Sequence, residues 1–156
     1  MTVSPSELSS TGYPLSNLRR IIPLPGYTPQ LGKLVSMMNF ARHTTLYDVK
    51  GLTVEQLDYR PAGFDNSIGA LLFHMAYTEI WYQLFTFEGR EPTPEEEKTW
   101  EAEQMGEKGS SMLKGHPLEY YLEQLKAVRR YTLEEFSKRD DAWLEVEYLD
   151  RAGATY

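Results

Sequence analysis

Two side chains within the stretch from Ser67 to Phe87 could do chemistry: an imidazole, His74, and a carboxylate, Glu79, in a run without Lys or Arg. Neutral imidazole is a common metal ligand, whereas a buried carboxylate needs a charged or hydrogen-bonding partner. Five residues of helix separate the two by about 140°, so they would be poor co-ligands of one ion. By residue type alone, His74 is either a hydrogen-bonded histidine in a helical core or a divalent-metal ligand.

The position of Glu79 on its helix indicates which residues could pair with its carboxylate. On a helix Glu79 falls on the same face as Ile68, Leu72 and Met75, which indicates burial. A buried carboxylate is tolerated when a cation or a hydroxyl satisfies it. We expect the partner to be Arg129 or a tyrosine hydroxyl.

The other two histidines and one acidic run are weaker candidates. His43 lies off the apolar face of its expected helix, and His116 precedes Pro117 in an expected loop, so both fit solvated histidines. Glu95–Glu97 are adjacent, and adjacent residues on a helix point apart, which favours a solvated face over a cation site. The chain has no cysteine, which excludes disulfides, thiolate metal sites and a cysteine nucleophile.

The element that must position His74 is a helix over Ser67–Phe87 that is apolar on nearly all sides. Asp65, Asn66 and Ser67 supply candidate N-caps, and Gly89 can end the helix. A helix of this kind is normally buried on most sides, so we expect it at the centre of a soluble bundle. Polar residues interrupt the run too often for a membrane span. The face that carries Glu79 consists of Ile68, Leu71, Leu72, Met75, Glu79 and Tyr82.

Two further long helices are predicted, at residues 29–49 and 117–138. In both, apolar residues recur at i, i+3 and i+4, and Thr28 can cap the first while Pro29 suits its first turn. Thr53 and Gln56 form a capping box for a short helical turn between them. The three long helices are therefore connected through a short helix and a polar segment, in which Trp100 is expected to dock on the body of the protein.

The two ends of the chain are predicted to be irregular. Residues 1–28 are rich in Ser, Thr, Pro and Gly and predict an N-terminal arm, which leaves 29–156 as the helical-bundle domain. Alternation of apolar and polar residues over 143–148 predicts a short extended piece.

The composition fits a single globular domain of 156 residues with 41% hydrophobic residues. The net charge of −7 and the dispersed basic residues argue against binding to nucleic acid. The first residues lack the charged start and apolar core of a signal peptide, and with the absence of cysteine this predicts a cytoplasmic protein with no membrane partner.

The segment GLTVEQLDYRPAGFDNSIGALLFHMAYTE resembles the DinB-like (DinB/YfiT-like) metalloenzyme superfamily of small bacterial four-helix proteins. The resemblance extends over about residues 28–149. It rests on a turn of the type "gLt-eqL-yrP" followed by a helix start of the type "nSIg-LL-H". The matching residues are Gly51, Leu52, Thr53, Gln56, Leu57, Tyr59, Arg60 and Pro61, then Asn66, Ser67, Ile68, Gly69, Leu71, Leu72 and His74.

The resemblance implies an all-α, DinB-like four-helix bundle of the up-down-down-up type. Three long helices do not close such a bundle, so something must cover the open side of the central helix. The candidates are the arm at 1–28, a partner chain, or a last long helix missing from this sequence. We favour the missing helix, with a homodimer as the second choice.

By the same resemblance, His74 matches one of three metal ligands, and the other two form a His-x-x-x-His pair that this sequence does not contain. The metal would be zinc, nickel, iron or manganese, and its open position would lower the pKa of a bound thiol or water. The implied function is a metal-dependent transferase or hydrolase, such as a thiol S-transferase with a small-molecule thiol substrate. The alternative is a non-catalytic bundle, a ligand-binding or dimerising stress-related protein. No catalytic residue and no reaction can be chosen from the residues themselves.

Overall fold

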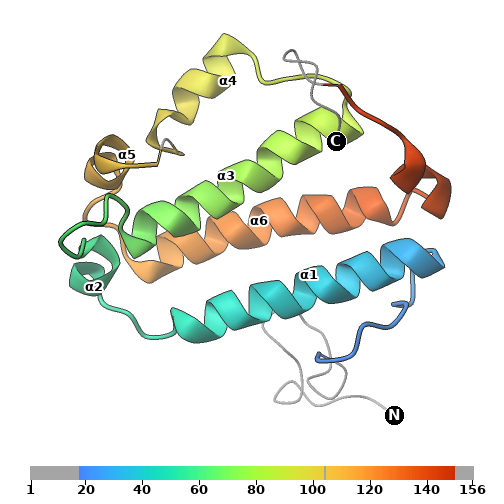
Figure 1. Ribbon diagram of the computed structural model, residues 1–156, viewed down its shortest axis with the longest axis horizontal. Helices are drawn as coiled ribbons and strands as arrows, with labels where there is room; N and C mark the ends of the chain where they lie inside the picture. Colours follow the sequence, from blue (N-terminus) through green and yellow to red (C-terminus); the bar gives the residue numbers. More distant parts are fainter. Residues whose placement is uncertain (1–17, 104, 150–156) are drawn as a thin grey trace. The chain divides into compact units, whose positions relative to one another are not determined.

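The computed structural model describes residues 18–103 and 105–149, and its regular elements in these ranges are α-helices and 3₁₀ helices (Figure 1). This confirms the predicted all-α class. The chain divides into two compact units. The first holds the described residues up to 50 together with 133–146, and the second holds 51–132 together with 147–149.

The first unit is built on α1 (Pro29–Asp48), which confirms the helix predicted at 29–49. Leu24 crosses the start of this helix closely, because a Cβ on Gly32 would lie 2.6 Å from the Leu24 backbone nitrogen. Leu31 and Val35 are fully buried in this part of α1. Glycine at position 32 is therefore required for the chain before α1 to pack on the helix.

The prediction that the Thr28 side chain caps α1 is wrong. Thr28 occupies the N-cap position, but its side chain accepts no backbone hydrogen bond and instead donates to Asp141. Asp141 Oδ1 accepts from the backbone N–H groups of Gln30 (2.9 Å) and Leu31 (3.1 Å). A carboxylate satisfies the unpaired donors at a helix start and interacts favourably with the helix dipole, so Asp141 acts as the cap.

The end of the chain was predicted to be extended over 143–148, and half of this is wrong. Residues 143–145 belong to a 3₁₀ helix, η4 (Asp141–Glu145), which Asp140 starts by accepting a hydrogen bond from Ala142 N–H. Trp143 packs on Phe136 with ring centroids 5.6 Å apart. The aromatic contact and the Asp140 cap outweigh the alternating pattern, and residues 146–148 continue outside any helix.

The second unit contains five helices that precede α6 among its described residues. They are α2 (Val54–Asp58), α3 (Ile68–Phe87), α4 (Pro94–Thr99), the 3₁₀ helix η3 (Glu101–Glu103) and α5 (Glu107–Met112). α6 (Leu118–Phe136) follows and lies beside α3 (Figure 1). The long helices predicted over Ser67–Phe87 and 117–138, and the Thr53–Gln56 capping box, are confirmed.

The expectation that α3 is buried on most sides is wrong along one stripe. Ile68, Leu71, Met75 and Tyr82 are 37%, 42%, 37% and 43% exposed. The side next to this stripe is buried through Leu72, Ala76 and Gln83, and Gln83 bonds to Val128 and Thr132 of α6. Apolar composition alone did not distinguish the two sides, since both carry large hydrophobic residues.

Some expectations fall outside what the structure describes. Residues 1–17 and 150–156 are not described, so the division into an arm at 1–28 and a domain at 29–156 stays a prediction, as does a missing fourth long helix. Across residues 18–103 and 105–149, no helix combines the length and the hydropathy that crossing a bilayer requires.

Candidate functional site

His74 lies in the middle of α3 and is half-buried. Its Nε2 is 3.3 Å from the hydroxyl oxygen of Thr78, one turn further along the same helix. A neighbour four residues on shares the helix face, so this pair follows directly from the sequence spacing. The hydroxyl can therefore fix the orientation of the ring.

The helix that carries His74 is fixed at its start by three polar contacts. Ser67, the predicted cap, accepts a hydrogen bond from Ala70 N–H at 3.2 Å. Its own N–H donates to the hydroxyl of Ser110 in α5 at 3.1 Å, and that hydroxyl donates to the carbonyl of Asp65 at 3.0 Å. Both serines are almost completely buried. The cap was predictable from local sequence, whereas the contribution of Ser110 was not.

A close approach between α3 and α6 sets the spacing of the two helices. Gly69 leaves room for Tyr121, since a Cβ at position 69 would lie 2.6 Å from the tyrosine oxygen. The Tyr121 hydroxyl donates to the carbonyl of Leu113 at 2.7 Å. Burial raises the pKa of Tyr121 to about 12, with smaller contributions from Asp58 and Tyr120. Tyr121 is therefore a neutral hydrogen-bond donor at physiological pH.

Of the two partners predicted for Glu79, Arg129 or a tyrosine hydroxyl, the structure shows Arg129. Arg129 on α6 donates from Nε to Oε1 at 2.7 Å and from Nη2 to Oε2 at 3.0 Å, which is a two-pronged ion pair. Both side chains are mostly buried, at 12% and 13% exposure. The Thr132 hydroxyl also donates to Oε1 at 2.6 Å. This second partner, Thr132, was not predicted from the sequence.

Gln83 extends this polar network and was also missed. Its Nε2 donates to the carbonyl of Val128 at 2.9 Å and to the Thr132 hydroxyl at 2.8 Å. In the sequence Gln83 reads as a polar interruption in an apolar helix. Its position four residues after Glu79, on the same helix face, is the signal that could have joined the two.

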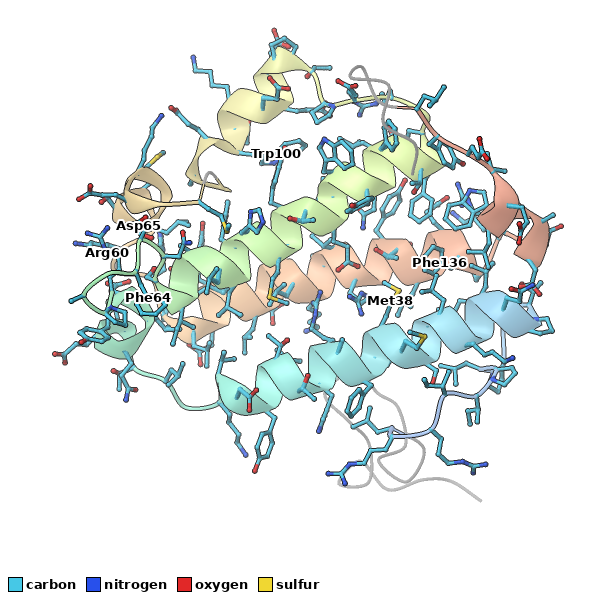
Figure 2. The ribbon with its side chains drawn as sticks, viewed as in Figure 1. Met38, Arg60, Phe64, Asp65, Trp100 and Phe136 are labelled. Atoms are coloured by element: carbon cyan, nitrogen blue, oxygen red, sulfur yellow. The ribbon has the colours of Figure 1, made fainter. Side chains whose placement is uncertain are left out.

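The polar segment after α3 contains an ion pair that was not predicted and a tryptophan, Trp100, that docks as predicted. Arg90 binds both carboxylate oxygens of Glu96 (2.8 and 3.0 Å), and Glu96 forms a capping box with Thr93 at the start of α4. The hydrogen bonds from Arg90 and from the Thr93 backbone lower the pKa of Glu96 to about 2. Trp100, which follows α4, lies over α3 (Figure 2) and packs edge-on against Tyr77, with ring centroids 4.6 Å apart.

The donor set for a metal is incomplete in the described part of the chain. A three-ligand site needs three donors that converge, and no group of three His, Cys, Asp or Glu side chains does so within residues 18–103 and 105–149. Glu79 is committed to Arg129, while His43 faces Tyr47 and His116 stacks on Tyr120. The described residues offer one imidazole at the predicted position, and by themselves they do not fit a metal site.

The comparisons with known proteins agree with the family resemblance that the sequence showed. No curated protein matches the chain. A model of the mycothiol-S-transferase family matches residues 33–154, which is well over half of the chain and includes all of α3 and α6. This family is DinB-like, and the resemblance drawn from the motifs around Pro61 and His74 is confirmed. The chain belongs to the mycothiol-S-transferase family.

Proposed function

We propose that this protein is a thiol S-transferase that acts on mycothiol, the thiol in the name of its family. In the proposed reaction the thiol sulfur forms a bond to an electrophilic carbon and a leaving group departs with the electron pair of its former bond. The thiol proton is released or taken up by the leaving group, so atoms and charge balance. Membership of the family over residues 33–154 is the observation that carries this proposal.

The structure supports a role for His74 in this function through its setting. α3 is fixed at its start by Ser67 and Ser110, and along its length by the Glu79–Arg129 pair. Functional side chains work best on elements whose position is locked by packing and polar contacts. The half-buried imidazole of His74, with Thr78 beside it, is therefore held on a rigid element.

We further propose that His74 supplies one ligand to a divalent metal ion, in keeping with the metal dependence of DinB-like proteins. Within residues 18–103 and 105–149 no three His, Cys, Asp or Glu side chains converge, so no further ligand is named. No step of the transfer is assigned to a metal for this reason. The contribution that the chain itself makes is the orientation of an imidazole by the Thr78 hydroxyl.

The test combines activity with metal content. Wild-type protein is incubated with mycothiol and the electrophile monobromobimane, and conjugate formation is measured against the uncatalysed rate; bound metal is quantified on the same sample. His74→Ala should abolish the enzymatic rate and lower the metal content. His116→Ala is the matched control, because that ring stacks on Tyr120 and should leave both quantities unchanged.

The two parts of the proposal fail separately. A wild-type protein that gives no conjugate above the uncatalysed rate contradicts the transferase. Conjugate formation that persists in His74→Ala with unchanged metal content contradicts only the role of His74. Because the chain has no cysteine, the chain itself adds no thiol to the assay. We also propose a cytoplasmic location for this protein, and the lack of cysteine agrees with it.

The alternative function, a non-catalytic ligand-binding or dimerising bundle, is favoured by one observation. The exposed stripe on α3, Ile68, Leu71, Met75 and Tyr82, carries no charge and follows the spacing of a helix-pairing seam. A second copy of the chain could cover it and form a homodimer. If so, Leu71→Glu should convert a dimer to a monomer in light scattering. A monomeric wild-type protein would contradict the dimerising form of this alternative.

A further inference from the structure

The segment at residues 90–103, between α3 and α5 in the second unit, has little apolar surface with which to pack. We call it the strap; it comprises α4 and η3 and runs from the end of α3 back along that helix (Figure 1). Six of its fourteen residues are Glu, and Trp100 is its one large apolar residue. α4 contributes no buried residue. Segments that bury so little apolar surface open locally at a low cost in free energy.

Trp100 attaches the strap to α3. Its ring packs edge-on against Tyr77 with centroids 4.6 Å apart, and Tyr77 is 7% exposed. The backbone N–H of Trp100 bonds to the carbonyls of Glu96 and Glu97, which ties the ring to the end of α4. Tyr77 comes three residues after His74, so the two are neighbours on the surface of α3. Trp100 therefore docks within one helical turn of the half-buried imidazole.

A glycine with a positive φ angle stands on each side of the strap. Gly89 (φ 64°) follows the residue that caps α3, and Gly106 (φ 104°) precedes α5. A Cβ built at either position meets no atom within 4 Å, so the surroundings do not block rotation there. Both ends stay attached, because Pro92 is buried beside Gly89 and the Gly106 N–H donates to Asn66 at 2.6 Å. Hinges are commonly a few residues at the ends of elements.

We propose that the strap is a lid beside His74, hinged at Gly89 and Gly106. The contact between Trp100 and Tyr77 keeps it closed. Undocking of Trp100 opens the adjoining face of α3, so that substrate reaches the imidazole and product leaves. This gating role rests on the proposed function, because it takes His74 as part of the reacting site. The competing explanation is a fixed connection whose aromatic contact only adds stability.

Hydrogen exchange in the full-length wild-type protein tests whether the strap opens. The amides of Glu97 and Trp100 bond within α4. They should exchange through a local opening that low concentrations of urea do not change, whereas amides in the middle of α3 should exchange only on global unfolding. Equal protection of α4 and α3 would overturn the lid. This measurement needs no variant, so it decides the question even if a substitution prevents folding.

Acylation by diethyl pyrocarbonate at a fixed pH, read by mass spectrometry, tests whether opening exposes His74. An aromatic pair of this kind shifts an equilibrium by about two- to tenfold, so Trp100→Ala should speed acylation of His74 by about that factor. Trp100→Phe keeps a ring on Tyr77 and should restore the wild-type rate. Trp143→Ala is the matched control, because its half-buried ring packs on Phe136 in the first unit, and it should leave the rate unchanged.

His43 and His116 serve as internal references in the same digests. An unchanged His74 rate in Trp100→Ala overturns the lid. An equal rise at all three histidines indicates general loosening of the fold and overturns it as well. Neither measurement uses a thiol, so the lid and the proposed function fail separately. A wild-type protein that forms no mycothiol conjugate contradicts the transferase, while exchange and acylation still decide whether the strap opens beside His74.

Discussion

The ion pair between Glu79 and Arg129 gives the sharpest prediction about stability. Replacing Arg129 by Met keeps much of the side-chain volume but removes the guanidinium that pairs with the Glu79 carboxylate, which is 12% exposed. Removing one partner of a buried pair typically costs 3–5 kcal/mol. The Thr132 hydroxyl still donates to Glu79 and a little water reaches it, so we expect a loss of about 2–4 kcal/mol in the free energy of unfolding.

The assay is urea unfolding followed by circular dichroism, with two comparison variants. Lys126→Met on the same helix breaks an ion pair with Glu123 whose side chains are 76% and 72% exposed, and it should cost less than about 1 kcal/mol. The double variant Glu79→Leu with Arg129→Met removes both charges. It should be more stable than Arg129→Met alone, because the penalty comes from the charge left behind.

Two results would refute this reasoning. One is a loss of less than about 1 kcal/mol for Arg129→Met, which would mean that water solvates Glu79 as well as Arg129 does. The other is a double variant no more stable than the single one. In that case the pair would contribute through packing and not through charge.

Three further predictions follow from other contacts. Gly69→Ala should lower the free energy of unfolding, measured in urea, by about 1–3 kcal/mol, because the new methyl group meets Tyr121. This loss is expected although alanine has the better helix propensity. An unchanged stability would contradict the close approach of Tyr121 to position 69. Arg90→Ala should raise the pKa of Glu96 from about 2 toward its usual value, measured by NMR titration. Since the folded pKa is depressed, the contribution of Glu96 to stability is present above about pH 4.5 and is lost as the pH falls toward 2, and an unmoved pKa would exclude Arg90 as the cause. Asp141→Ala should speed hydrogen exchange of the first amides of α1, and unchanged exchange would show that another group caps the helix.

The sequence predicted the long helices to within a few residues because the signals that start and stop a helix are local. Ser67 caps α3 by bonding an amide three residues on, and the Thr53–Gln56 box spans the same distance. Arg129 could also be named as one of two possible partners of Glu79, since a buried carboxylate needs a cation or a hydroxyl. The structure shows the pair between α3 and α6. His74 was singled out by its place in the motif, and the family match supports that motif while its metal role remains a proposal.

The sequence by itself therefore determined the three long helices, the short turn that Thr53 starts, their order and the family, since these depend on spacings of three or four residues and on a motif within one segment. Only the tertiary structure decided which groups meet across the chain. Asp141 caps α1 from 111 residues beyond Gln30, and an apolar stripe of α3 stays exposed although its composition predicted burial. Contacts of this kind depend on how whole helices pack, because a side chain's partners and exposure are set by neighbours that its local sequence does not specify.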